Sequence, residues 1–119
     1  MKTVILCSPY KPKSDLGTFE YVQELSKNLR YARLCLLDSM KNHGEAPFLS
    51  HLLYPQVLDD NIPEERELGI EAEHAWFIGA HAVVIYMDLG VSEGMRRAIE
   101  LGEKLGLKKE ERKLKGWIG

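Results

Sequence analysis

One segment, Ala80 to Leu105, constrains the fold of this chain more than any other. It begins with an apolar, β-branched run over residues 82–87, turns at residues 88–90, and continues into a helical pattern that starts near Ser92. A buried strand, a tight loop and a helix N-terminus in this order are typical of α/β proteins that hold a ligand over the loop. The free N–H groups and partial positive charge of the helix start favour a polar ligand there.

Apolar runs indicate two further strands. Thr3 to Cys7 is continuously apolar, which fits a strand buried on both faces of a parallel sheet. Residues 45–49 are a weaker candidate, in which Pro47 fits an edge strand or a strand end. Beyond Gly106 the chain is highly charged, so we expect no buried strand there and treat residues 107–119 as a charged C-terminal extension.

Helical patterns separate these strands. Residues 18–43 repeat apolar side chains every three to four positions, with Thr18 placed to cap the start and Gly44 placed to stop the helix. Pro63 is well placed to begin a second helix, because its fixed backbone angle suits a first helical turn. The order β-α-β-α-β-α predicts one layered α/β domain with a parallel sheet.

Composition excludes several classes of protein. A net charge of −2 gives no reason to expect nucleic acid or an acidic membrane as partner. The longest weakly polar run, residues 75–87, is shorter than the roughly 18 residues that a membrane span requires. Cys7 and Cys35 stand alone in the sequence and fit buried thiols of a reducing cytosol. With no targeting segment apparent, we expect a cytoplasmic protein.

Three loops should converge at the carboxyl ends of the strands, where parallel α/β sheets bind their ligands. They span residues 8–15, 50–60 and 88–94. The polar side chains that they would bring together are Ser8, Tyr10, His51, Tyr54, Asp59, Asp88, Ser92 and Glu93. No G-x-G-x-x-G, Walker or H-E-x-x-H pattern is present, so we expect neither a dinucleotide cofactor nor a bound metal ion.

Each candidate also has a simpler structural interpretation. The run Ser92-Glu93-Gly94-Met95 offers a hydroxyl, a carboxylate and a close backbone approach, yet a helix cap with a glycine needed for packing would also explain it. The run Ser8-Pro9-Tyr10 could contact a base or a phosphate, or form a rigid turn.

The middle loop leaves similar alternatives open. Asp59 and Asp60 could bind Mg²⁺ or orient a ribose, although such a pair more often forms a turn and a helix cap, as we expect for Asp60. His51 could act as an acid, a base or a phosphate donor, or be part of the polar surface.

These residues carry a resemblance to a known family. The pattern is Ser8-Pro9-Tyr10, then Pro47…His51-Leu52…Pro55…Leu58-Asp59-Asp60…Pro63-Glu64-Glu65-Arg66…Gly69, then Ser92-Glu93-Gly94-Met95. It resembles a family of small, mostly uncharacterised phage and bacterial proteins that is similar to the nucleoside 2-deoxyribosyltransferases. The resemblance covers residues 1–106. It implies a single three-layer domain with a Rossmann-like or flavodoxin-like parallel sheet, and a nucleoside or nucleotide pocket.

The resemblance also implies roles for acidic residues. In the transferases a glutamate early in the last helix attacks the sugar C1′, and an acidic residue on the preceding helix orients the base or sugar, a role that Glu71 or Glu73 could match. Here the nucleophile position falls on Ala98, which cannot attack a sugar. Glu100 lies about 200° further around the helix. Glu93 is nearer the loop and could substitute at a different depth.

We therefore expect a binding protein that holds a nucleotide or an ADP-ribose-like metabolite without turning it over; a phage protein of this kind could sequester a host nucleotide signal. The expected contact residues are Ser8, Pro9, Tyr10, His51, Asp59, Glu71, Glu73, Asp88, Ser92, Gly94 and Met95. The alternative is an enzyme that transfers or hydrolyses an N-glycosidic bond, with Glu93 as nucleophile or general acid.

A second alternative is a structural subunit with a vestigial pocket. The apolar helix stripes, together with Trp117 and Ile118, would then make the contacts between subunits. For the binding protein we expect a homo-oligomer with a small-molecule partner, and no nucleic acid, membrane, metal or cofactor.

Overall fold

A computed structural model of the protein describes residues 1–118. In chain order the elements are β1 (Thr3–Cys7), α1 (Phe19–His43), β2 (Ala46–Phe48), the short 3-10 helices η1 (Ser50–Leu52) and η2 (Tyr54–Gln56), α2 (Pro63–Phe77), β3 (Ala82–Tyr86), α3 (Glu93–Lys104) and β4 (Lys108–Arg112).

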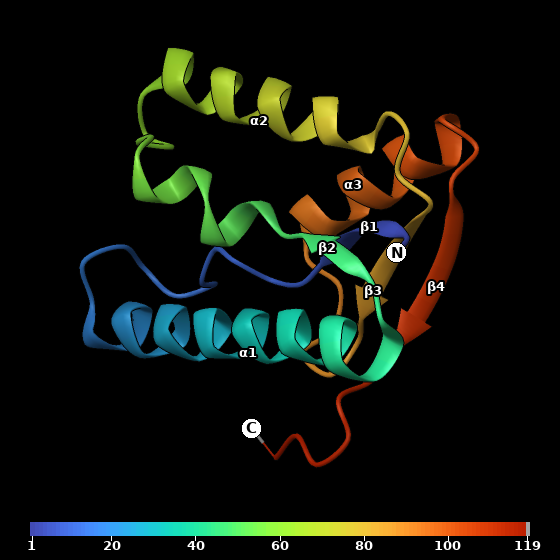
Figure 1. The fold of residues 1–119 in the computed structure, drawn as a ribbon. Helices are drawn as coiled ribbons and strands as arrows, with labels where there is room; N and C mark the ends of the chain where they lie inside the picture. The colour runs from blue at the N-terminus through green and yellow to red at the C-terminus, as the bar shows by residue number, and fades with distance from the viewer. Residues whose placement is uncertain (119) are drawn as a thin grey trace.

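The strands form one parallel sheet in the order β2-β1-β3-β4. Val4 of β1 pairs with Ala82 of β3, and the register continues across β3 so that Ala82 pairs with Lys108 of β4. α1 covers one face of the sheet, and α2 and α3 cover the other (Figure 1). The predicted fold, a single three-layer α/β domain with a Rossmann-like or flavodoxin-like sheet, is confirmed.

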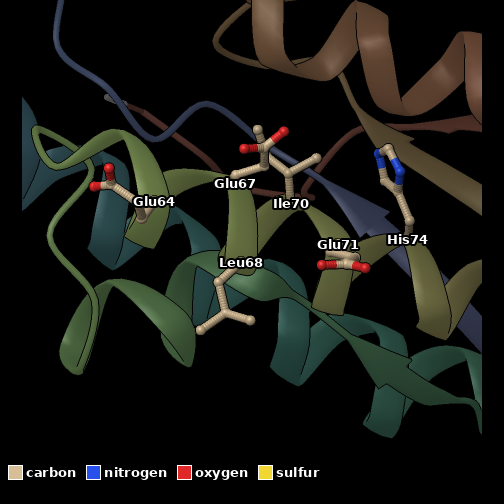
Figure 2. A pocket seen from close by; sticks show the side chains of 6 residues that line it. All are labelled: Glu64, Glu67, Leu68, Ile70, Glu71 and His74. Carbon is tan, nitrogen blue, oxygen red and sulfur yellow. The ribbon is translucent and has the colours of Figure 1, made fainter.

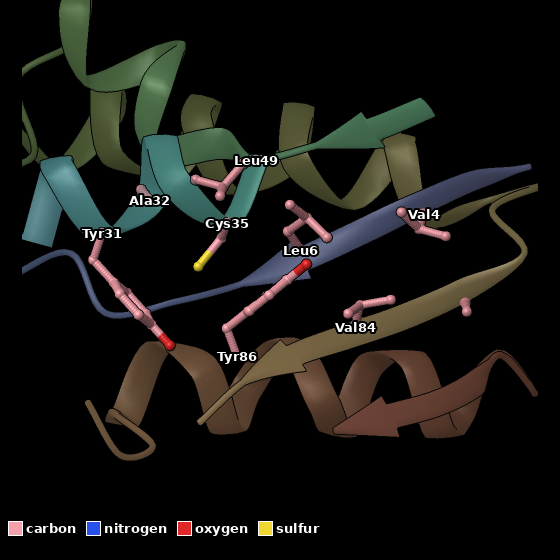
Figure 3. Close-up of a cluster of buried hydrophobic side chains, with 9 residues drawn as sticks. Val4, Leu6, Tyr31, Ala32, Cys35, Leu49, Val84 and Tyr86 are labelled. Carbon is pink, nitrogen blue, oxygen red and sulfur yellow. The ribbon is translucent and has the colours of Figure 1, made fainter. Parts of the chain in front are cut away.

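Alternating side chains of the central strands build a separate core on each face of the sheet. On the α1 side, Leu6 and Val84 pack with Tyr31 and Cys35 of α1 (Figure 3). On the other side, residues such as Ile5 pack in a second core with Phe77, Val83, Ile85 and Met95. Every residue of β3 is buried, which explains why its sequence is continuously apolar rather than alternating.

The helix ends follow local capping chemistry. Thr18 caps α1 by accepting a hydrogen bond from the backbone N–H of Tyr21, and Gly44 closes the helix in the left-handed region at φ 63°. Pro63 opens α2 as predicted, but the N-cap residue is Ile62 and not Asp60. Among residues 1–118, no helix combines the length and the apolar character needed to cross a membrane.

The strand that follows Gly106 is not buried, as expected, but the prediction that residues 107–119 form an extension is wrong. Lys108–Arg112 forms β4, which pairs with β3 along its whole length, so these residues belong to the sheet and not to an extension. β4 is an edge strand, and most of its side chains stay in solvent while its backbone groups pair with β3. A charged sequence can therefore complete the sheet without burying its charges.

Arg112 is the exception in β4, since its side chain is only 8% exposed. Its guanidinium donates to both carboxylate oxygens of Glu45, at 2.8 Å and 2.7 Å, and also bonds Glu110. Ser39 of α1 donates to the same Glu45 carboxylate at 2.8 Å. The hydrogen bonds from Arg112 hold the pKa of Glu45 below its usual value.

Tyr86 extends this cluster by donating its hydroxyl to Asp38 at 2.7 Å. We call the whole set the Arg112 network; its members are Asp38, Ser39, Glu45, Tyr86, Glu110 and Arg112. The network ties the last strand to α1 and to the residue before β2, which are distant in sequence.

The segment after β4 packs back onto α1. The ring of Trp117 meets Tyr31 edge-on, with 4.8 Å between ring centroids, and the guanidinium of Arg30 lies 5.3 Å from the Trp117 ring. Trp117 therefore contacts the body of its own chain, whereas Ile118 is exposed.

Candidate functional site

Residues from the first two predicted loops meet at the carboxyl end of β1. The ring Nε2 of His51 lies 2.7 Å from the backbone carbonyl of Ser8, and the His51 ring stacks on Tyr10 with 5.1 Å between centroids. Pro9, which is partly buried, lies between Ser8 and Tyr10 in the chain. We call Ser8, Tyr10 and His51 the Ser8–His51 cluster.

Burial lowers the pKa of His51, so the ring is neutral at pH 7. A carbonyl only accepts hydrogen bonds, so Nε2 must carry the ring proton that points to Ser8. The other ring nitrogen, Nδ1, is then an acceptor without a proton. The cluster thus combines an aromatic surface with a hydrogen-bond acceptor.

The Ser8 hydroxyl is a buried polar group without a partner. Ser8 is 1% exposed, and within residues 1–118 its Oγ forms no hydrogen bond. An unmade bond of this kind costs about 1–3 kcal/mol, so most buried hydroxyls in proteins are paired. The Ser8 hydroxyl therefore keeps a hydrogen-bonding capacity that no group among residues 1–118 uses.

Glu73, not Glu71, belongs to this end of the sheet. Burial raises the pKa of Glu73, and the nearby charges of His74 and Arg97 and a hydrogen bond from Ser50 lower it in part. Glu73 therefore lies where α2, the loop after β2 and α3 approach one another.

Cys7, the last residue of β1, gives independent support for that position. Burial and then the charge of Glu73 raise its thiol pKa to about 12, so Glu73 stands near the end of β1. Arg97, a cation in the second turn of α3 that sequence reasoning missed, lies four residues after Glu93 on the same helix.

Glu71 points to the outer side of α2. It lines a shallow hollow of about 490 Å³ together with neighbours from the same helix (Figure 2): Glu64, Glu67, Leu68, Ile70 and His74. A second cavity, of about 300 Å³, is apolar and lies by β2 under Trp76 and Leu53. Neither cavity includes Ser8, Tyr10 or His51.

Asp88 is turned toward α1 and is already paired. Its Oδ2 accepts hydrogen bonds from the Tyr31 hydroxyl at 2.6 Å and from the backbone N–H of Leu114 at 2.9 Å. The Tyr31 hydroxyl in turn accepts from the backbone N–H of Asp88. Asp88 therefore holds the C-terminal segment against α1.

The middle loop separates its two aspartates. Asp59 is exposed and forms a turn, in which its carboxylate accepts from the backbone N–H of Asn61 at 2.9 Å. Asp60 lies closer to the Ser8–His51 cluster. Burial is the largest effect on the pKa of each ring. The negative charge of Asp60 raises the pKa of Tyr10 and, after the hydrogen bond to Ser8, also that of His51. Sequence reasoning had assigned Asp60 to the turn and cap.

At the start of α3, some residues cap the helix and others are exposed to solvent. Ser92 caps the helix by accepting from the backbone N–H of Met95 at 3.2 Å, and Met95 is buried in the second core. Glu93 and Gly94 are exposed. Ala98, at the expected nucleophile position, packs against the second core.

Two glycines of α3 differ in the space around them. A Cβ on Gly102 would lie 2.5 Å from Cγ2 of Val83, so this glycine lets α3 approach β3 closely. A Cβ on Gly94 would meet nothing within 4 Å. Packing within the chain therefore does not require glycine at position 94, and the space beside it is open.

Residues 2–112 match a protein family described as a domain of unknown function, DUF7768. The chain belongs to this family. No curated protein matches the sequence of this DUF7768 member.

A solved structure shares its fold. It is a 2-deoxyribosyltransferase from Bacillus psychrosaccharolyticus, which superimposes with a TM-score of 0.63 at 13% sequence identity, over 98% of this chain and 76% of that chain. The resemblance expected from the motifs is thus confirmed at the level of the fold.

The carboxyl end of the sheet in this DUF7768 member offers distinct polar functions within one region. They are the stacked Tyr10–His51 pair, the unpartnered Ser8 hydroxyl and the Glu73 carboxyl group near Arg97. Such groups can bind a flat, polar molecule by stacking and hydrogen bonding. Among residues 1–118, no three His, Cys, Asp or Glu side chains are arranged to hold a metal ion.

Proposed function

We propose that this chain binds a nucleotide or an ADP-ribose-like metabolite at the carboxyl end of its sheet and holds it without turnover. The observation that carries the proposal is the stacked Tyr10–His51 pair, fixed by the hydrogen bond from His51 to Ser8. Aromatic rings bind bases by stacking, which is worth about 1–3 kcal/mol per base. The fold shared with a 2-deoxyribosyltransferase supports a nucleoside-type ligand.

The polar groups beside the stacked pair would orient that ligand. The buried Ser8 hydroxyl and the free Nδ1 of His51 would bond the base or ribose, and Gly94 leaves room at the start of α3. Glu73 and Asp60 supply the carboxyl groups in this proposal. Of the residues first expected at the site, Asp59, Glu71, Asp88 and Met95 are left out because each faces another part of the structure.

The residue at the expected nucleophile position supports holding without turnover. Ala98 has no group that could attack a sugar carbon, and its side chain packs into the core. In this proposal a bound nucleotide leaves the site intact. By the same proposal, a phage-encoded member of the family would capture a nucleotide signal of its host.

The test is incubation of the purified protein with nucleosides, nucleoside monophosphates, NAD and cyclic ADP-ribose isomers. Chromatography of the supernatant and of the denatured protein then separates turnover from capture. We expect intact ligand to be released only on denaturation. We also expect His51→Ala to weaken binding about tenfold or more, since stacking is lost. His81→Ala, an exposed histidine before β3, is the matched control and should bind normally.

A second candidate function is cleavage or transfer of an N-glycosidic bond. The observation that favours it is Glu73, since a half-buried carboxyl group with a raised pKa is suited to act as a general acid. Free base in the supernatant would support this function and overturn capture. Glu73→Gln and Glu93→Gln would then show which carboxylate is needed. Absence of binding to every compound would favour a structural subunit.

A further inference from the structure

The outer face of α1 is apolar and positively charged. Large apolar side chains are exposed along it: Phe19, Val22, Leu34, Leu37 and Met40. Arg30, Arg33 and Lys41 are exposed on the same face, since they recur at helical spacing from Phe19. Two acidic residues of α1, Glu24 and Asp38, are instead bonded to Ser14 and Tyr86, which leaves Glu20 at the flank of the first turn.

The outer face of α2 is apolar and negatively charged. Glu64, Glu67 and Glu71 line the shallow hollow on this face beside Leu68 (Figure 2). Arg66, the arginine of α2, is not among the residues that line it. Within residues 1–118, these three glutamates form no ion pair with another side chain.

The two faces cannot meet within one chain, because α1 and α2 lie on opposite sides of the sheet (Figure 1). Contact between two α1 faces would place arginine against arginine, and contact between two α2 faces would place glutamate against glutamate. Contact between α1 of one copy and α2 of another places opposite charges together and covers apolar side chains on both helices. Charge complementarity of this kind selects the partner and its orientation.

We propose that the outer face of α2 docks onto the outer face of α1 of a second copy of this chain, so that copies associate head to tail. A contact between two different faces leaves one face of each kind free at the ends, and further copies can extend or close the assembly. α2 is only about 22 Å long. One such face is smaller than the roughly 800 Å² per partner of a stable complex, so the association is weak and salt-sensitive.

Sedimentation velocity measures this association directly. At low salt the sedimentation coefficient of the wild type should rise with concentration between about 10 μM and 1 mM, the range of weak contacts, and salt should reverse the rise. Two variants each reverse the charge of one of the two faces. Arg33→Glu with Lys41→Glu alters α1, and Glu67→Lys with Glu71→Lys alters α2.

Each variant alone should associate about tenfold more weakly or worse, because like charges now face each other. A mixture of the two should pair the intact α2 face of the first variant with the intact α1 face of the second. Both remaining faces are charge-reversed and therefore again opposite in sign, so the mixture should recover the concentration-dependent, salt-sensitive association of the wild type. Arg30 stays unchanged because it covers Trp117. Lys2→Glu with Lys104→Glu, exposed positions outside both faces, is the matched control.

Several outcomes would overturn the proposal. One is a wild type that remains monomeric over the whole range, and another is association unchanged in either variant. Loss in the α1 variant alone would indicate that α1 contacts an acidic surface of the second copy other than α2. A mixture that does not recover association would also contradict the two-face contact. Circular dichroism and unfolding midpoints check that each variant is folded.

Discussion

The Arg112 network and the Ser8–His51 cluster are both largely buried and polar, yet they differ in how their groups are satisfied. In the Arg112 network, the guanidinium, the Glu45 carboxylate and the Ser39 hydroxyl all have partners within the chain. In the cluster, the Ser8 hydroxyl has none, and neighbouring Glu73 is held with a raised pKa. Paired groups stabilise a fold, whereas an unpaired buried group costs stability.

The largest test of this difference is removal of Arg112. Arg112→Met leaves the Glu45 carboxylate in a mostly buried position without its cation, so the free energy of unfolding should fall by about 3 kcal/mol. Lys109→Met on the same strand removes only an exposed pair with Glu103 and should change stability by less than about 0.5 kcal/mol. Urea denaturation measures both. Equal losses in the two variants would show that the network does not stabilise the domain.

Two buried serines provide a closely matched comparison. Ser39→Ala removes a hydroxyl that donates to Glu45, and we expect a loss of about 1–2 kcal/mol of unfolding free energy. Ser8→Ala removes a hydroxyl without a partner, so stability should stay the same or rise, while nucleotide binding weakens. Denaturation and ligand titration of both variants provide the two readouts. A Ser8→Ala variant as unstable as Ser39→Ala would contradict the contrast.

Substitution of Glu73 should change the free energy of unfolding by less than the substitutions above, and Glu71, two residues earlier on α2, allows a matched comparison. The pKa of Glu73 is raised in the folded protein, so folding favours its protonated form, and stability falls as pH rises from 4.5 through the folded pKa. Glu73→Gln should therefore raise the free energy of unfolding at pH 7 by about 0.5–1 kcal/mol. This gain should disappear near pH 4, where the carboxyl group is protonated in both states.

Glu71→Gln is the control for this substitution, since Glu71 faces solvent on the outer side of α2. Its stability should be that of the wild type at both pH values. A Glu73→Gln variant that loses stability at pH 7 would show that the ionised carboxylate is satisfied within the fold.

The smallest expected effect comes from His51. Its pKa is lowered in the folded protein, so the unfolded chain takes up a proton first as pH falls below 6.5. The wild type should lose stability between pH 7 and pH 5, and His51→Gln should flatten that slope. Thermal unfolding across this range measures it, with His81→Gln as the exposed control. An unchanged slope in His51→Gln would assign the pH dependence to other groups.

Much of the fold could be predicted from the sequence because buried strands and capped helices have strong local patterns. The apolar runs of β1 and β3 and the Thr18 and Gly44 signals of α1 each correspond to an element of the structure. β4 was missed because its strand structure comes from backbone pairing with β3 rather than from burial. Its anchor, the pair between Arg112 and Glu45, joins positions too distant for a local pattern to reveal.

The candidate site was less predictable. Parallel topology brings the first two loops together, but it does not decide which way each side chain points. Glu71 and Glu73 are alike in sequence context, and only packing of α2 separates the exposed residue from the half-buried one. The sequence could not show that Asp88 accepts a hydrogen bond from the backbone N–H of Leu114, which is distant along the chain. The one local signal for Arg97 was its position one turn after Glu93 on α3.

The edges of the sheet have a consequence for how copies of this chain can aggregate. An open strand edge is a template on which another chain can add a strand, and long apolar edges seed fibres. Here one edge, β4, is made only of charged residues, and the other, β2, has three residues with Pro47 at its centre. Both ends of the sheet thus discourage strand addition, so the domain should tolerate high concentration without forming amyloid.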